Sequence, residues 1–187
     1  MSTDTMIYKK VKSSLITFSQ LMLPSHSNFS GKIHGGFILS LLDQIAFACA
    51  SKYSGKYCVT ASVDQVDFLS PVEVGELLTL KASVNYVGRT SVVVGIRVES
   101  QNIQTGDVKH CNSSYFTMIC KDENGQNVEA PKLILKTSDE VRRFYKALQR
   151  IEERRNAKSQ LKNSVDCKSE EMINNLIENH FVKIEMD

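Results

Sequence analysis

The pattern of apolar and polar positions divides the chain into one long apolar helix and a series of alternating strands. Residues 34–50 read HGGFILSLLDQIAFACA, and apolar residues lie on nearly every face of the helix that this run predicts over about 35–52. Gly55 provides a C-terminal stop for it. A helix that is hydrophobic all round is typically buried, so we expect this helix to lie at the centre of the fold.

Strand-like runs stand on both sides of this helix. An apolar, partly β-branched run over 14–23 ends at Pro24 and predicts a first strand. Alternation after the helix predicts four more strands, the first with a phase slip of the kind that a β-bulge produces. Short turns join them, so they should pair in antiparallel fashion. Residues 1–12 are polar, and we expect them to be frayed. The four strands are predicted over residues 57–68, 76–87, 90–103 and 108–120.

The composition changes after residue 135, which predicts a main domain over 1–135 and a helical extension over 136–187. Thr137 and Glu140 have the spacing of a capping box in front of an amphipathic helix that should run to about residue 162. Its basic face is most simply a solvated surface, and contact with lipid or RNA is the sharper alternative. The weakly amphipathic residues beyond 163 could form one more short helix.

Composition narrows the class of protein. A chain of 187 residues with 42% hydrophobic and 24% charged residues is ordinary for a globular domain. The net charge of +2 is too small to indicate a nucleic-acid partner. No apolar run reaches the roughly 18 residues of a membrane span, and the N-terminus lacks the apolar region of a secretory signal. The cysteines form no CxxC pair, so we expect reduced thiols and a cytoplasmic location rather than disulfides or a metal site. They stand at positions 49, 58, 111, 120 and 167.

Asp43 is the only carboxylate in the apolar helix. Ser40 and Gln44 share its stripe of the helix surface, because residues three or four apart lie on one face. A carboxylate inside a buried helix is costly unless it is paired or has a chemical task. Asp43 is therefore a candidate catalytic residue, and a structural carboxylate bonded to a nearby hydroxyl or amide is the alternative.

Three segments, within residues 15–130, resemble the acyl-CoA thioesterases of the bacterial YciA type and the related mammalian brain acyl-CoA hydrolases. They read LMLPSHSNFSGKIHGGFILSLLD, TASVDQVDFLSPVEVGE and VGRTSVVVGIRVES, in the family's order. The resemblance implies the α+β hotdog fold, in which an antiparallel sheet wraps around a long helix. It also implies hydrolysis of fatty acyl-CoA to free fatty acid and CoA, without a metal or a separate cofactor. Family members commonly form homodimers that assemble into hexamers as trimers of dimers.

The resemblance also implies roles for three residues. The family's acidic catalytic residue falls on Asp43, its loop asparagine on Asn28 and a strand threonine on Thr60. Asp43 would deprotonate the water that attacks the thioester carbon, or else attack that carbon itself through a mixed anhydride. Asn28 would hold the water or the carbonyl oxygen, unless it only shapes a turn. Thr60 would donate to Asp43 or to the water, unless it only packs in its strand.

Gly35 and Gly36 stand at the start of the helix, where exposed N–H groups could polarise the thioester carbonyl. Close packing is the alternative reason for these glycines. Asp43 lies eight residues after Gly35, so the two are roughly 12 Å apart along one helix. They cannot easily hold the same carbonyl in one chain, whereas two antiparallel helices related by a twofold axis bring the start of one near the middle of the other. We therefore predict an active site shared between two chains.

Residues 88–91 form a strand connection that offers a cation, two hydroxyl groups and glycine amides, a combination that suits the phosphates of CoA. An ordinary hairpin with an exposed arginine is the alternative. His34 is a further candidate contact for CoA, although a loop histidine is the simpler interpretation. YciA-type proteins often have phenylalanine in its place, so we do not expect it to be catalytic. The four residues of the connection are Gly88, Arg89, Thr90 and Ser91.

Two other functions are compatible with a fold of this kind. A dehydratase or hydratase of acyl thioesters would need an acid–base pair, usually histidine with a carboxylate, and no PGVL-like motif follows His34. A non-catalytic module that binds CoA or a nucleotide would need additional binding sequence, of which the basic helix after residue 136 is the only sign. Release of free thiol from acyl-CoA separates these functions from hydrolysis.

Overall fold

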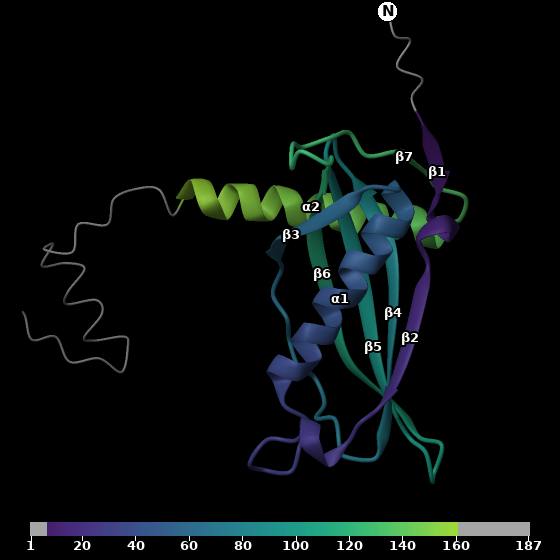
Figure 1. Cartoon of the computed structure of the whole chain (residues 1–187), viewed down its shortest axis with the longest axis vertical. Helices are drawn as coiled ribbons and strands as arrows, with labels where there is room; N and C mark the ends of the chain where they lie inside the picture. Colours follow the sequence, from purple (N-terminus) through teal and green to yellow (C-terminus); the bar gives the residue numbers. More distant parts are fainter. Residues whose placement is uncertain (1–6, 161–187) are drawn as a thin grey trace, which may run out of the picture. The chain divides into compact units, whose positions relative to one another are not determined.

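The computed structural model describes residues 7–160, with side chains as far as residue 157. A five-stranded antiparallel sheet curves around one long helix (Figure 1). The strand order is β2-β4-β5-β6-β3, so the strand after the helix lies at one edge and the strand before it at the other. This arrangement agrees with the predicted α+β architecture. The strands are β2 (Ile16–Leu21), β3 (Tyr57–Val63), β4 (Glu76–Val87), β5 (Ser91–Asn102) and β6 (Val108–Lys121).

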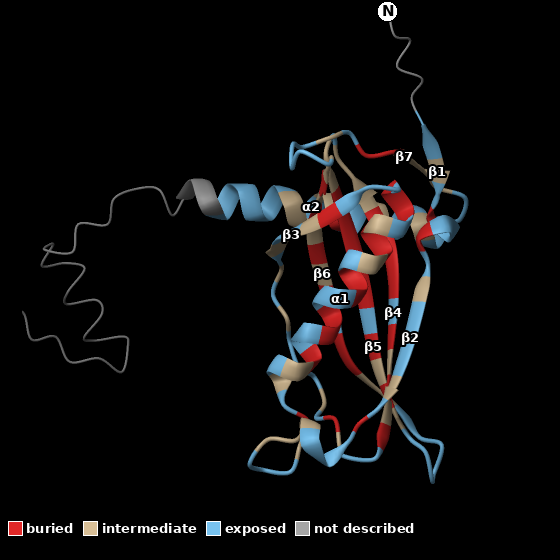
Figure 2. Cartoon of the chain, viewed as in Figure 1, coloured by how far each residue is buried: buried red, intermediate tan, exposed pale blue. Residues whose placement is uncertain are grey.

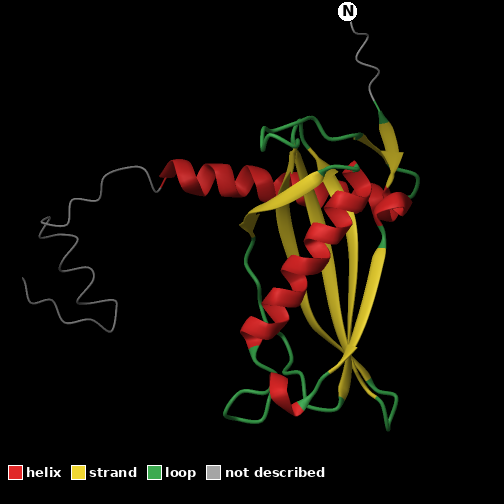
Figure 3. Cartoon of the chain, in the orientation of Figure 1, coloured by secondary structure: helices red, strands yellow, loops and turns green. Residues whose placement is uncertain are grey.

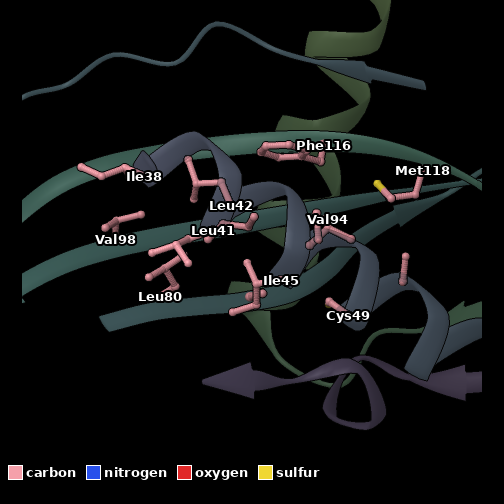
Figure 4. Packing of buried hydrophobic residues seen from close by; sticks show 14 of the residues in the cluster. Ile38, Leu41, Leu42, Ile45, Cys49, Leu80, Val94, Val98, Phe116 and Met118 are labelled. Carbon is pink, nitrogen blue, oxygen red and sulfur yellow. The ribbon is translucent and has the colours of Figure 1, made fainter. Parts of the chain in front are cut away.

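The central helix α1 (Gly35–Ser54) lies across the concave face of the sheet. It begins after His34, whose Nδ1 accepts a hydrogen bond from the N–H of Gly36, and it ends at Gly55 with a left-handed backbone. Figure 4 shows its apolar side chains packed against strand residues such as Leu80, Val98 and Phe116. Burying each large apolar side chain contributes about 1.5–3 kcal/mol. The buried apolar residues of α1 are Ile38, Leu41, Leu42, Ile45, Ala46, Cys49, Ala50 and Tyr53.

The prediction that α1 is buried on every side is wrong for the single chain. Figure 2 shows buried and exposed residues recurring along the helix. Leu39 is 38% exposed, Phe47 is 39% exposed, and Asp43 between them is exposed as well. The physical reason is that one sheet covers only one side of a helix. The apolar residues on the other side indicate a second covering surface that one chain does not provide.

Strand β3 is shorter than predicted. Its pairing with β6 slips between Thr60 and Ser62, so the β-bulge lies earlier than the alternation suggested. The chain leaves the strand after Val63 and runs beside β6 as a loop. Two backbone bonds hold the loop there, from Asp64 N–H to Tyr115 O and from Leu69 N–H to Cys111 O. The apolar residues beyond Val63 therefore lie in this loop and not in the predicted strand.

Residues 1–12 were predicted to be frayed, and this prediction is wrong for residues 8–12, which form regular structure. Strand β1 (Tyr8–Lys10) pairs in parallel with β7 (Lys132–Ile134), and a short 3₁₀ helix, Val11–Ser14, follows it. Val11 is only 6% exposed. Pairing with a strand more than 120 positions away satisfies the backbone of β1, and local polarity gives no sign of such a partner.

The second helix, α2 (Ser138–Gln160), begins at the predicted capping box (Figure 3). The N–H of Glu140 donates to Thr137 Oγ1 at 3.2 Å, and the N–H of Thr137 donates to the Glu140 carboxylate. The chain divides into two compact units between Leu148 and Gln149, inside α2. Within the first unit, Phe144 contacts Tyr86 of β4. The domain boundary at 135/136 stays a prediction, and the short helix predicted beyond 163 lies outside the described residues.

Candidate active site

Asp43 and Thr60 are the two predicted site residues that the structure brings into direct contact. Thr60 Oγ1 donates a hydrogen bond to Asp43 Oδ1 at 2.6 Å, a short distance typical of a charged acceptor. Asp43 lies in the middle of α1 and Thr60 lies at the bulge of β3, where the irregular pairing turns side chains out of the regular ladder. Within residues 7–160 no other hydrogen bond to Asp43 occurs, so its second carboxylate oxygen stands open to a ligand.

Asn28 organises the loop between the 3₁₀ helix Pro24–His26 and the start of α1. Its Oδ1 accepts three hydrogen bonds, from the N–H and the hydroxyl of Ser30 and from the N–H of Lys32. These hydrogen bonds stabilise a turn, which was the alternative role predicted for Asn28. It also fixes the amide so that its Nδ2 donor remains for another acceptor. An ion pair of 2.5 Å between Lys32 and Glu73 anchors the loop.

The two glycines at the start of α1 differ in how their amides are used. The N–H of Gly36 donates to His34 Nδ1 at 3.0 Å and is therefore already part of the helix cap. Glycine at position 36 suits this contact, because a Cβ there would lie 3.1 Å from His34 Nδ1 and the imidazole would have to shift by a few tenths of an ångström. The N–H of Gly35 has no hydrogen-bond partner in the part of the chain that the structure describes. Of the two predicted carbonyl donors, Gly35 is the one that is available.

The connection Gly88–Ser91 is a tight hairpin between β4 and β5, as its alternative interpretation expected. The N–H of Gly88 donates to Ser91 O at 2.8 Å, and the carbonyl of Arg89 accepts from Ala130 N–H. These bonds fix the backbone of Arg89 while its side chain stays exposed. Among the described residues the Arg89 guanidinium has no ion-pair partner, so it can serve a phosphate.

One chain does not bring these three groups together. Strand β4 begins at Glu76, beside the Asn28 loop, where Met22 N–H donates to Glu76 O. It ends at Val87, beside the hairpin of Arg89, and its twelve residues span roughly 36 Å. The Asn28 loop and the hairpin therefore lie at opposite ends of β4, and the helix α1, which carries Asp43 in its middle, runs along the sheet (Figure 1).

An exposed apolar surface surrounds Asp43. Phe47 and Tyr57 meet edge to face, with ring centroids 5.5 Å apart, and both rings are exposed. β3 is the last strand of the sheet, so its outer edge has no neighbouring strand in the chain as described. An apolar patch beside an open strand edge is typical of a protein–protein interface. The large exposed apolar residues of α1, β3 and the following loop are Leu39, Phe47, Tyr57, Val63, Phe68 and Leu69.

The cysteines of the described segment are free thiols, as predicted. Cys49, Cys58, Cys111 and Cys120 are all buried, and Cys167 lies outside the described residues. Burial raises the pKa of Cys49 to about 12, which keeps that thiol protonated. No group of three His, Cys, Asp or Glu side chains suited to a metal occurs between residues 7 and 157. No helix of the described segment is both long and apolar enough to cross a membrane.

Comparison with known proteins identifies the class of protein to which this fold and site belong. The family profile of the thioesterase superfamily matches residues 30–106. Protein VdlD of Helicobacter pylori is 48% identical over 139 residues, which are 74% of this chain and 79% of that protein. YkhA of Bacillus subtilis, an uncharacterised acyl-CoA thioester hydrolase, is 31% identical over 79% of this chain and 86% of its own length. The chain therefore belongs to the thioesterase superfamily.

Solved structures agree with this assignment. A hexameric acyl-CoA thioesterase in its apo form superimposes with a TM-score of 0.79 at 35% identity, over 84% of this chain and 99% of that one. An acyl-CoA hydrolase from Staphylococcus aureus, solved with butyryl-CoA and CoA, gives 0.77 at 26% identity over 91% and 99%. That hydrolase was also solved as alanine variants at its Asp43, Thr60 and Asn28, the residue types found at the same numbers here. The thioesterase family, the hotdog fold and the enzyme class are confirmed, and membership of the YciA type stays a prediction.

Proposed function

We propose that this chain hydrolyses fatty acyl-CoA to a free fatty acid and CoA, with Asp43 as the general base. The observation that carries the proposal is the hydrogen bond from Thr60 to Asp43, which orients the carboxylate and leaves one oxygen open to water. The relatives support the substrate, because YkhA is described as an acyl-CoA thioester hydrolase and the S. aureus hydrolase was solved with butyryl-CoA. CoA is then part of the substrate and no separate cofactor takes part.

The chemistry needs one proton to move twice. Asp43 takes a proton from a water molecule as the water oxygen forms a bond to the thioester carbon. The carbonyl oxygen becomes an oxyanion, for which the Gly35 N–H and the Asn28 Nδ2 are the donors that the structure leaves available. The carbon–sulfur bond then breaks, and the thiolate of CoA receives the proton from Asp43. In the covalent alternative the open oxygen of Asp43 attacks the thioester carbon, and the carbon–sulfur bond breaks to release the CoA thiolate. Water then cleaves the mixed anhydride to give the fatty acid and the free Asp43 carboxylate, and the proton that this water loses neutralises the thiolate.

The site is shared between two chains in this proposal. Asp43 and Thr60 come from one chain, and Asn28 and Gly35 come from its partner. The roughly 12 Å between Gly35 and Asp43 along one helix support this division. The uncovered side of α1 and the open edge of β3 support a twofold interface at this place. The hexameric thioesterase of similar structure supports further assembly into a trimer of dimers.

The hairpin of Arg89 would hold the phosphates of CoA. Its backbone is fixed and its cation has no partner in the described segment, so binding a phosphate would break no ion pair. We place the enzyme in the cytoplasm. The four buried free thiols and the mammalian relatives described as cytosolic acyl-CoA thioester hydrolases support this location.

The dehydratase alternative is less compatible with the site. Such an enzyme needs a histidine paired with a carboxylate, whereas His34 Nδ1 is occupied by the N–H of Gly36. Asp43 lies nine residues further along the same helix, too far for it to pair with His34 in one chain. A module that only binds CoA would keep the exposed cation at Arg89 but would not need Asp43 or its orientation by Thr60.

Release of thiol from a series of acyl-CoA substrates of increasing chain length tests the proposal. The unaltered chain should release CoA, and Asp43→Asn should lower the rate by on the order of 10²–10⁴ while fold and assembly persist. Asp107→Asn is the matched control, because Asp107 also accepts a hydrogen bond from a threonine, Thr105, at 2.6 Å. Binding of CoA without any thiol release would favour the binding module. Near-normal turnover by folded Asp43→Asn would refute the role of Asp43.

A further inference from the structure

A polar cavity lies on the convex face of the sheet, away from α1. It has a volume of about 290 Å³ and lies between β4, β5, β6 and the first part of α2, as far as Lys146. This space corresponds to roughly ten water molecules, which places it at the lower end of small-molecule sites. Its lining is strongly basic. The five cations are Lys81, Arg97, Arg142, Arg143 and Lys146.

Four of these cations share two carboxylates. Lys81 and Arg97 share Glu99, with distances of 2.6 and 2.7 Å. Arg142 and Arg143 share Asp139 in the same way. Hydrogen bonds from these cations hold the pKa of Glu99 and of Asp139 below its usual range, so both carboxylates are ionised at neutral pH. Two carboxylates against the four cations that share them leave this group with a net positive charge and a positive potential.

Asn85 contributes an unpaired donor to the floor of this cavity. The pairing of β4 with β5 slips between Val84 and Tyr86, so Asn85 is the extra residue of a β-bulge and is only 6% exposed. Its Oδ1 accepts from the Ser83 hydroxyl at 3.0 Å, which directs Nδ2 over Gly95. The space exists because Gly95 has no side chain, since a Cβ would lie 2.1 Å from Asn85 Nδ2. No described residue accepts a hydrogen bond from this Nδ2.

This Nδ2 faces the cavity without an acceptor in the described segment, and it lies among cations that also only donate. A ligand for this cavity therefore has to bring acceptor oxygens and negative charge. A phosphate monoester carries close to two charges at neutral pH and several acceptor oxygens, and arginine binds it in a two-pronged manner. A carboxylate brings one charge and two oxygens, which leaves more of the donors unpaired.

We propose that this cavity is a binding site for a small phosphorylated molecule, whose phosphate group lies between Asn85 Nδ2 and the surrounding cations. The site is separate from the proposed thioesterase site, because Asp43 and Thr60 lie on the concave side of the sheet. Neither they nor Asn28 and Arg89 line the cavity. We therefore expect thioester hydrolysis to be independent of these cations.

Inorganic pyrophosphate is a suitable probe, with thermal unfolding and calorimetric titration performed at constant ionic strength. At a hundredfold excess over Kd it should raise the Tm of the unaltered chain by roughly 5–10 °C. Asn85→Asp keeps the shape of the side chain but places a carboxylate among the cations. This variant should be more heat-stable without pyrophosphate and should lose the pyrophosphate-dependent rise. Arg143→Gln should weaken pyrophosphate binding about tenfold.

Arg155→Gln is the matched control, since Arg155 lies on the same helix and does not line the cavity. An equal pyrophosphate effect in Asn85→Asp and the unaltered chain would overturn the proposal, as would equal losses in Arg143→Gln and Arg155→Gln. If Asn85→Asp does not fold, the comparison of the two arginine variants decides. A KM that rises in Arg143→Gln for acyl-CoA but not for acyl-pantetheine would assign the cavity to the CoA nucleotide instead, and a separate site would be ruled out.

Discussion

The environment of Asp43 determines both the exposure of its carboxylate and the partner that orients it. An isolated charge in an apolar helix was enough to predict a special carboxylate, and the family resemblance added Thr60 as its hydroxyl partner. Its exposure was not predictable, because the sequence does not say which side of the helix the sheet covers. In the structure the carboxylate lies on the uncovered side and is held by Thr60. Its apolar neighbours Leu39 and Phe47 mark the surface that a second chain would cover in the proposed dimer.

The partnership with Thr60 leads to a prediction for kcat. Thr60→Val keeps the shape of the side chain but removes the donor, and a hydrogen bond to a charged group is worth about 1.5–3 kcal/mol. We expect kcat to fall roughly 10–100-fold with little change in KM, because the bond orients the base and does not hold the substrate. Thr60→Ser keeps a hydroxyl and should retain most of the activity. Equal activity in Thr60→Val and the unaltered chain would mean that Asp43 is positioned by other groups.

Residue type and spacing in the sequence predicted which side chains belong to the site, but not how each hydrogen-bond donor and acceptor is used. The contact between Asp43 and Thr60 follows from the family motif. The use of the Gly36 amide by His34 does not, because two adjacent glycines look alike in sequence while their N–H groups point to different partners. The same limit applies to Glu73, whose ion pair with Lys32 anchors the Asn28 loop but which has no distinctive pattern around it.

At the scale of elements, alternation predicted the long strands, the continuous apolar run predicted α1 and the amphipathic spacing predicted α2. The features that these patterns did not predict depend on contacts with residues far away in the sequence. The strand β1 forms because β7 pairs with it. The strand β3 ends early because the loop after it donates backbone hydrogen bonds to carbonyl groups of β6 outside the regular ladder. The bulges of β3 and β4 move single residues, Ala61 and Asn85, out of the ladder. A break in the alternation of apolar and polar residues indicates that a bulge is present, but it does not show which residue forms the bulge.

The turn before β4 gives a prediction for stability and pH. Burial alone would raise the pKa of Glu76, but hydrogen bonds from Glu73 N–H, Lys109 and the Ser100 hydroxyl outweigh it and hold the pKa below its usual range. A lowered pKa means that the ionised carboxylate stabilises the fold above the unfolded value of about 4.3 and that this contribution is lost as the pH falls through the folded value.

Glu76→Gln should therefore lower the free energy of unfolding by about 2 kcal/mol at pH 7. The difference from the unaltered chain should shrink as the pH falls below the unfolded value and through the lowered folded value, and it should vanish once Glu76 is protonated. Urea unfolding at a series of pH values measures this difference. A deficit of the same size at pH 7 and pH 3 would show that the charge of Glu76 contributes nothing and that only its shape matters.

At the scale of the whole molecule, the groups proposed to act on one substrate lie far apart in one chain. The hairpin of Arg89 and the loop of Asn28 stand at opposite ends of β4. Substrates with and without the CoA nucleotide separate the contribution of the hairpin from that of the loop. Arg89→Ala should weaken the binding of full acyl-CoA and leave acyl-pantetheine, which lacks the nucleotide, nearly unaffected. The loss should be smaller at high salt, where an exposed cation already contributes little. Equal losses on both substrates would make Arg89 a structural residue.

The central claim is that Asp43 of one chain acts with Asn28 of its partner, and refolding a mixture of two inactive variants tests it. Asp43→Asn and Asn28→Ala are unfolded together and refolded, with different tags to confirm exchange. In a mixed pair one site carries both lesions and the other carries neither. Random pairing makes about half of the pairs mixed, with one intact site of two, so activity should return to roughly a quarter of that of the unaltered chain.

The control mixture combines Asp43→Asn with Thr60→Val. These two residues meet within one chain, so every site of a mixed pair keeps one lesion and no recovery should follow. Recovery with Asn28→Ala and none with Thr60→Val is the result that a shared site predicts. Activity that stays at the average of the two variants in both mixtures, with exchange confirmed by the tags, would contradict a site shared between chains.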